Sequence, residues 1–176
     1  FKMIILINGP LGVGKSTVSW ELLRVFERAV MLDGDYFAAL QPFSVHRPAD
    51  LDYVYQSMAH QLNFHFDNGY RNMIVNYVFE NEHAVQKLVL LLHHFQLPIF
   101  AFYLRCEAAT CENRIRLRGN DQVEWEIERS AALRLKMEEQ AQQGSIGTII
   151  DTTRRSPAEV DNAILTHLKN TENGNN

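Results

Sequence analysis

The chain has 176 residues, of which 46% are hydrophobic and 22% are charged, and its formal net charge is −4. This length fits one domain and this composition supports a hydrophobic core, so an intrinsically disordered chain is excluded. The negative charge and the lack of a long basic run exclude a surface for double-stranded nucleic acid, although not a single nucleic-acid end as substrate.

In chain order, the hydrophobic pattern predicts strand 3–8, helix 15–29, strand 29–35, helix 50–69, strand 72–79, helix 81–96, strand 97–106, helix 107–119, helix 121–143, strand 147–153 and helix 156–170. Apolar strands joined by helical crossovers indicate a five-stranded parallel sheet with helices on both faces. We therefore expect one α/β domain over residues 1–170, followed by a disordered tail over residues 171–176.

Two helix starts carry capping signals. Asp121 with Glu124 fits a capping box. Ser156 with Glu159 fits another, with Pro157 at the first helical position, where proline is favoured. We expect both boxes to set the first turn of their helices.

We expect a soluble, cytoplasmic protein that is a monomer or a homodimer and has no membrane partner. No apolar stretch approaches the ~20 residues that a membrane-spanning helix needs. Residues 1–7 run directly into a glycine-rich loop, without the small-residue cleavage site of a signal peptide. Cys106 and Cys111 are too few for a disulfide framework, and we expect reduced thiols.

The loop at residues 9–16 matches the phosphate-binding pattern G-x-x-x-x-G-K-[ST] between a strand and a helix. Its glycines let backbone N–H groups close around phosphates at the positive end of the following helix. Lys15 would reach the β- and γ-phosphates, and the Ser16 hydroxyl would bind Mg²⁺. The expected nucleotide-binding residues of this loop are Gly9, Leu11, Gly12, Val13, Gly14, Lys15, Ser16 and Thr17.

Two carboxylates, Asp33 and Asp35, end the second predicted strand. The carboxyl ends of parallel strands meet at the ligand crevice, so we expect both groups near the phosphate loop. On an extended segment, residues two apart point the same way. We expect Asp33 to hold Mg²⁺ together with Ser16, and Asp35 to take the proton of an attacking hydroxyl. The alternative is that Asp-Gly-Asp is only a turn.

With these motifs, the chain resembles the small P-loop kinases, which include shikimate, gluconate, adenylylsulfate and nucleoside monophosphate kinases. Besides the phosphate loop, the resemblance rests on "LDGD" at 32–35, "RCEAATCENRIRLRG" at 105–119, "DQVEWEIERSAAL" at 121–133 and "IIDTTRRSPAEV" at 149–160. It implies a three-layer α/β/α P-loop fold, similar to the nucleoside monophosphate kinases, with a helical lid at residues 114–142. It also implies ATP and Mg²⁺ as cofactors.

The resemblance implies roles for two arginines. Arg114 would stack on adenine and Arg118 would reach the transferring phosphoryl group, while Thr152 and Arg155 would line the adenine. The spacing agrees in part, because residues four apart share a helix face and Arg116 points elsewhere. A solvated basic face and ordinary turn residues are the alternatives.

The acceptor half departs from these families. No arginine follows "LDGD" directly, and Asn76-Tyr77-Val78-Phe79-Glu80 stands where shikimate kinases carry a glycine cluster. The expected acceptor-binding residues are Asp35, Tyr36, Arg47, Asn76 and Arg129, with Phe37, Tyr77 and Glu80 as further candidates. The aromatic residues suggest a ring-containing or sugar-like acceptor, and core packing is the alternative.

Two classes of function follow from this pattern. The first is an ATP- and Mg²⁺-dependent phosphotransferase, with Lys15, Asp35 and Arg118 as catalytic residues, acting on a hydroxyl or phosphate of a small molecule. Within this class the acceptor would also include an antibiotic or a nucleic-acid end. The second is a nucleotide-binding regulatory module without acceptor phosphorylation. It is disfavoured because such a module does not need a placed base.

Overall fold

The computed structural model describes residues 2–174, and these contain a parallel sheet of five strands in the order β2-β3-β1-β4-β5. The strands are β1 (Met3–Asn8), β2 (Ala29–Asp33), β3 (Asn72–Asn76), β4 (Ile99–Arg105) and β5 (Thr148–Asp151). Every pairing is parallel, including β1 with β3 and β1 with β4. The predicted five-stranded parallel sheet is therefore confirmed.

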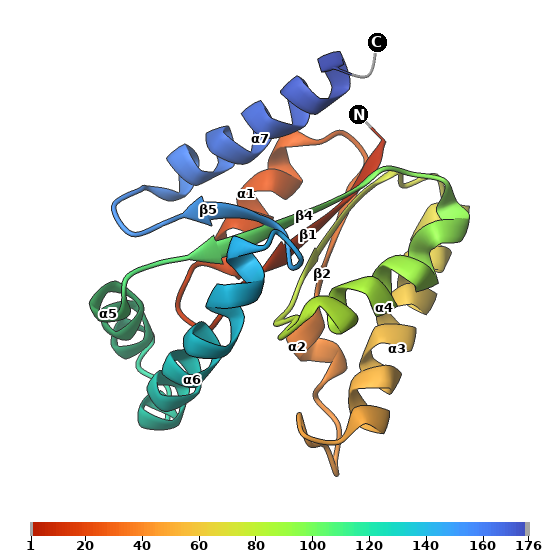
Figure 1. Ribbon diagram of the computed structural model, residues 1–176. Helices are drawn as coiled ribbons and strands as arrows, with labels where there is room; N and C mark the ends of the chain where they lie inside the picture. Colours follow the sequence, from red (N-terminus) through yellow and green to blue (C-terminus); the bar gives the residue numbers. More distant parts are fainter. Residues whose placement is uncertain (1, 175–176) are drawn as a thin grey trace.

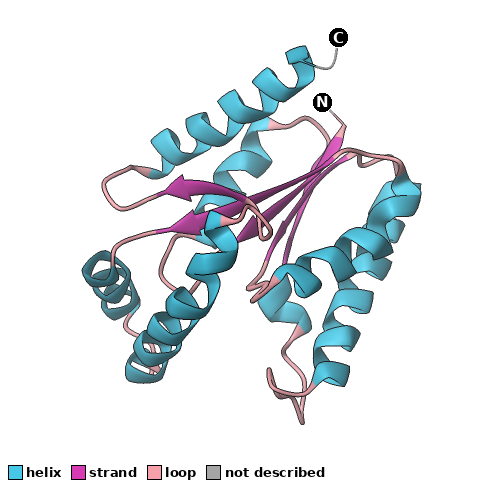
Figure 2. Cartoon of the chain, in the orientation of Figure 1, coloured by secondary structure: helices cyan, strands magenta, loops and turns pink. Residues whose placement is uncertain are grey.

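Helices cover both faces of this sheet and its carboxyl edge (Figures 1 and 2). α1 and α7 lie on one face and α3 and α4 on the other, while α2, α5 and α6 lie toward the carboxyl ends of the strands (Figure 1). The helices are α1 (Lys15–Val25), α2 (Gly34–Phe37), α3 (Pro48–Asp67), α4 (Glu82–Leu92), α5 (Ala108–Arg118), α6 (Val123–Gln142) and α7 (Pro157–Gly174), and a 3₁₀ turn, η1 (His93–Phe95), follows α4. This arrangement confirms the three-layer α/β/α fold.

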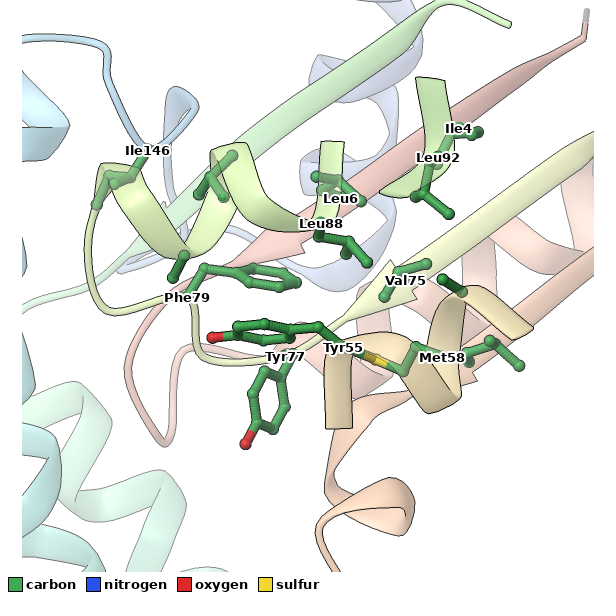
Figure 3. Packing of buried hydrophobic residues seen from close by; sticks show 14 of the residues in the cluster. Ile4, Leu6, Tyr55, Met58, Val75, Tyr77, Phe79, Leu88, Leu92 and Ile146 are labelled. Carbon is green, nitrogen blue, oxygen red and sulfur yellow. The ribbon is translucent and has the colours of Figure 1, made fainter. Parts of the chain in front are cut away.

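The alternation of strand side chains divides the core into two layers. Ile4 and Leu6 of β1 face the α3 and α4 side, whereas Met3, Ile5 and Ile7 face the α1 and α7 side. All five side chains are buried, because a central parallel strand is covered on both faces. Figure 3 shows the first of these layers.

Several expected boundaries need correction. α1 ends at Val25 rather than at residue 29, since Phe26 is extended and Arg28 takes a positive φ of 49° as the chain turns into β2. β3 ends at Asn76 rather than at residue 79. In the loop that follows, the Phe79 N–H and carbonyl bond to the Asn8 side chain. α7 continues through Gly174, so residues 171–174 of the expected disordered tail are helical, and residues 175–176 lie outside the described residues.

The two capping predictions have different outcomes. The box before α7 is confirmed, because the Ser156 N–H donates to Glu159 Oε2 at 2.7 Å and the Glu159 N–H donates to Ser156 Oγ at 3.4 Å. The box before α6 is wrong. Glu124 instead accepts from Arg116 at 2.7 Å, which removes it from the helix start.

The cysteines also differ from expectation. Cys106 follows β4 and Cys111 lies in the second turn of α5, and the structure joins them in a disulfide. Their Cα atoms are 6.3 Å apart, within the range that a disulfide spans. The strand-to-helix turn brings two residues five apart into this position, so the expectation of reduced thiols is corrected.

Among residues 2–174, no helix is both long and apolar enough to cross a membrane.

Asp161, on the buried side of α7, predicts a pH dependence of stability. Burial, together with the charge of Glu21 on α1, raises the pKa of Asp161 to about 6. A folded-state pKa above the unfolded value means that the folded state binds more protons, so the free energy of unfolding falls as pH rises through this range. We expect Asp161→Asn to raise Tm at neutral pH and to lose this advantage below about pH 4.

Thermal melts of both proteins from neutral to acid pH would measure this difference. Glu21→Gln serves as the control, because the Glu21 charge is the smaller of the two causes and its removal should raise Tm less. Parallel Tm curves for Asp161→Asn and the unchanged protein would contradict the prediction.

Candidate active site

The phosphate loop occupies the turn from β1 to α1, with Lys15 as the first residue of the helix. Gly12 shows why the loop needs glycine, because its φ is +83° and a Cβ there would lie 2.8 Å from the Cys111 carbonyl oxygen. Side chains would thus strain the backbone and push the loop away from α5. Lys15 and Ser16, the first residues of α1, line the cavity described below.

Lys15 is the charged group of this loop. Its Nζ donates to the Pro10 carbonyl oxygen at 3.1 Å. Burial lowers the Lys15 pKa to about 8, although the negative charges of Asp35 and Asp33 act in the opposite direction. The amine is therefore close to titration in the free protein.

This pKa predicts how nucleotide affinity varies with pH. We expect the dissociation constant for Mg·ATP to stay nearly constant up to about pH 7.5 and to rise by up to about tenfold per unit above pH 8, because the neutral amine loses its attraction to phosphate. Titration calorimetry across this range would measure it. Lys15→Arg keeps its charge and should give a flat profile over the same range. An equally steep rise in that variant would contradict the assignment to Lys15.

Asp33 and Asp35 are held in place by a short helix rather than by an extended strand. Asp33 ends β2 and caps α2, where its Oδ1 accepts from the Asp35 N–H at 3.1 Å. Its other oxygen, Oδ2, accepts from the Ser16 hydroxyl at 3.1 Å. The extended geometry expected for this segment is therefore wrong. The bond between Ser16 and Asp33 places the two residues expected to hold Mg²⁺ side by side.

The Gly34 between the two carboxylates permits a close approach. A Cβ at Gly34 would lie 2.3 Å from Cδ2 of the Tyr77 ring, so a larger residue would displace the ring or the helix. The buried Asn76 lies at the neighbouring strand end, in register with Asp33. With its amide nitrogen turned toward Asp33, it donates to the two carboxylate oxygens at 3.3 and 3.2 Å.

Asp35 has the electrostatics of a group that exchanges a proton. Burial raises its pKa above the usual value, and the nearby charge of Asp33 acts in the same direction. The positive charges of Lys15 and Arg118 oppose that rise. A carboxylate of increased basicity beside a phosphate loop is suited to general-base chemistry.

Arg114 connects α5 to the loop after β5. Its guanidinium donates to the Thr152 carbonyl oxygen at 2.7 Å and to Thr152 Oγ1 at 3.0 Å. It also donates to the Val13 carbonyl oxygen in the phosphate loop at 3.4 Å. Arg116 points away, toward Glu112 and Glu124. Arg114, Thr152 and the phosphate loop thus form one contiguous group.

A cavity of about 860 Å³ extends from the phosphate loop between α3, α4 and α6. Gly14, Lys15, Ser16 and Asp35 are among the residues that line it. Arg118, at the end of α5, lines it beside the start of α6. The aromatic and larger aliphatic side chains that line it are Leu11, Phe43, Val45, Leu51, Tyr55, Tyr77, Val78, Trp125 and Leu133. Its size is that of a small-molecule site.

A family comparison identifies the domain. Residues 4–138 match the family model described as "AAA domain" (AAA_33), which is well over half of the chain. The chain belongs to the AAA_33 family. No curated protein matches the sequence.

Solved structures share the fold of this AAA_33 domain. The gluconokinase of Sinorhizobium meliloti 1021 superposes with a TM-score of 0.71 and 15% identity, covering 97% of this chain and 94% of the other. The tunicamycin resistance protein of Deinococcus radiodurans gives 0.68, 19% identity and 96% coverage of both chains. A sugar kinase from Janibacter sp. HTCC2649 gives 0.65, 16% identity, and 96% and 95% coverage. The fold is that of the P-loop small-molecule kinases.

The AAA_33 domain brings together some of the expected acceptor residues and not others. Asp35 and Arg129 line the cavity. Tyr36 is 82% exposed, and Arg47 pairs with Asp50 at the start of α3; within the described chain neither is among the lining residues. The side chain of Arg155 is exposed, and its backbone N–H donates to Thr152 O at 3.5 Å.

Two polar residues that the motifs did not single out hold the site together. The Asn8 side chain accepts from the N–H groups of Gly9 and Phe79 at 2.8 and 2.9 Å and donates to the Phe79 carbonyl at 3.0 Å. Ser130 of α6 donates to the Leu11 carbonyl at 2.7 Å and so joins this helix to the phosphate loop. The sequence could have pointed to Asn8, because it is a polar residue at the end of an apolar strand. No sequence pattern distinguishes Ser130.

Proposed function

We propose that this AAA_33 domain is an ATP- and Mg²⁺-dependent phosphotransferase that moves the γ-phosphoryl group to a hydroxyl of a small molecule. The observation that carries the proposal is that Lys15 and Asp35 line the same cavity of about 860 Å³. A phosphate-binding amine and a basic carboxylate then face the same enclosed space. The kinase names of the solved structures support a phosphotransferase in general.

The residues present fit a nucleotide and a divalent ion. The exposed N-terminus of α1 and the Lys15 amine suit phosphate, and the Ser16 hydroxyl bonded to Asp33 offers two oxygen ligands of the kind that Mg²⁺ prefers. Within residues 2–174 no cluster of three or more His, Cys, Asp or Glu side chains is suited to hold a metal alone, so the nucleotide phosphates would complete the site. Bound Mg·ATP would supply the phosphoryl group to be transferred and a divalent charge beside it.

The side chains would act on the acceptor and on the phosphates in separate ways. Asp35 would orient the acceptor hydroxyl and accept its proton as the new bond to phosphorus forms. Lys15 would hold the phosphate oxygens, and Arg118, carried by α5 beside the lid helix, would offset charge on the group in transfer. Arg114 and Thr152 would hold the nucleotide base. Closure of α5 and α6 over the cavity would exclude water, which otherwise competes with the acceptor.

ADP release from Mg·ATP across pools of hydroxyl-bearing compounds tests this function. The pools comprise sugars, sugar acids, nucleosides, antibiotics and short nucleic acids with free 5′ ends. Release that depends on one pool would support the kinase. Tight Mg·ATP binding without release in any pool would contradict it and favour the regulatory module.

A further inference from the structure

The cations that line the cavity beyond the phosphate loop each lie beside a carboxylate of the same chain. In the described part of the molecule, the lining residues include Lys87, Arg118, Arg129 and Lys136 as well as Lys15. Lys87 pairs with Asp52, and Arg118 lies 3.8 Å from Glu126. Arg129 and Lys136 both pair with Glu80. Within residues 2–174, an anionic acceptor would meet a carboxylate beside each of these four cations.

Glu80 makes two of these ion pairs. Arg129 donates to its Oε1, and Lys136 donates to its Oε2 at 2.7 Å, so each carboxylate oxygen holds one cation. The Glu80 side chain is only 19% exposed, as is that of Arg129. Ion pairs in such partly buried positions are screened less by salt than surface pairs.

The backbone on either side fixes Glu80 in this position. The preceding residue, Phe79, is fully buried, and both its N–H and its carbonyl bond to the Asn8 side chain. The following residue, Asn81, caps α4 by accepting from the Ala84 N–H at 2.9 Å. The backbone of Glu80 is therefore held on both sides by hydrogen-bonded neighbours.

Its partners lie on one stripe of the lid helix α6. Arg129, Leu133 and Lys136 are spaced by four and three residues, so they share a helix face, and Leu133 is buried. The same face therefore presents two cations and an apolar side chain to the cavity. The pairing with Glu80 also links this helix to the loop after β3.

Part of the cavity wall is aromatic. Tyr55 and Tyr77 meet edge to face, with centroids 6.2 Å apart and planes at 82°, and Phe79 packs beneath them. Figure 3 shows the two hydroxyl groups pointing away from Leu88 and Leu92. Burial raises the pKa of Tyr55 to about 12 and raises that of Tyr77 as well, so both hydroxyls are neutral at neutral pH. This wall suits a ring that carries hydroxyl groups.

We propose that the acceptor is an uncharged, ring-bearing hydroxyl compound, and that Glu80 selects it against anionic analogues by engaging the side chains of Arg129 and Lys136. The inference rests on the proposed phosphotransferase function. A carboxylate or phosphate on the acceptor would have to displace Glu80 from its partners or lie beside a like charge, and either costs binding free energy.

Matched pairs of acceptors test this selection. Each pair consists of a neutral compound and its anionic counterpart, such as an aryl glucoside with the aryl glucuronide, and a nucleoside with its 5′-monophosphate. We expect acceptor-dependent ADP release with neutral members and a kcat/KM at least ~10-fold lower with anionic members. For Glu80→Gln, we expect this ratio to shrink or invert because two cations lose their partner. Glu80→Asp, which keeps the charge, should retain the preference.

Glu128→Gln is the matched control, since it makes the same change on α6 at an exposed residue outside the cavity, and it should leave the ratio unaltered. A wild-type preference for the anionic members, or an unchanged ratio in a folded Glu80→Gln, would overturn the inference while leaving the kinase intact. If Glu80→Gln does not fold, the wild-type ratio still decides. No release with any acceptor overturns the proposed function and this inference together.

Discussion

Replacing Asp35 by asparagine is expected to lower kcat by roughly 10²- to 10⁴-fold, the range that a positioned general base contributes. Asparagine keeps the shape of the side chain and removes its capacity to accept a proton. Asp35 lines the cavity, and burial raises the pKa of its carboxyl. Because Asp33 and not Asp35 bonds to Ser16, Mg·ATP affinity should change little.

Steady-state kinetics with the identified acceptor and calorimetric titration of Mg·ATP would separate these two effects. Asp67→Asn is a suitable control, since it makes the same change at an exposed residue at the end of α3 and should leave both quantities unchanged. An unchanged kcat in Asp35→Asn would show that this carboxylate only lines the cavity.

The second large effect is expected for Lys15→Met, which should lower kcat/KM for ATP by roughly 10²- to 10³-fold. Methionine retains much of the side-chain length but removes the charge and the donors that would meet the phosphates. The change should appear both as weaker Mg·ADP binding and as slower turnover, because the amine would hold the phosphates before and during transfer.

The same substitution at Lys169, an exposed residue of α7, provides the comparison. Fluorescent-nucleotide titration and initial rates would measure both proteins. Removing such a donor should cost far more than twofold in kcat/KM for ATP. If the kcat/KM of Lys15→Met stayed within about twofold of that of Lys169→Met, the phosphate-binding role of Lys15 would be wrong.

Local sequence patterns predicted most of the fold and the position of the phosphate loop. The five strands carry continuous apolar runs, and the phosphate loop is a contiguous motif, so both are readable over short windows. The start of α2 was not readable in this way, because Asp-Gly-Asp suits a strand end, a turn or a helix cap. The structure resolves it as a cap, through the bond from the Asp35 N–H to Asp33.

The acceptor half depends on contacts between distant residues. Glu80 lies 49 residues from Arg129 and 56 from Lys136, and no local pattern announces that one carboxylate holds both cations. Likewise, Glu124 fits a capping box by spacing, but its pairing with Arg116 on the preceding helix prevails. Tertiary placement decides which partner a surface carboxylate takes.

The most direct test of the proposed function is to follow the phosphoryl group itself. Wild-type protein and Asp35→Asn would be incubated with γ-labelled Mg·ATP and the acceptor pool, and the products separated and analysed by mass spectrometry. The phosphotransferase account predicts a labelled acceptor heavier by one phosphoryl group with the wild type and little of it with the variant. Label found only in inorganic phosphate, in equal amounts for both proteins, would contradict it.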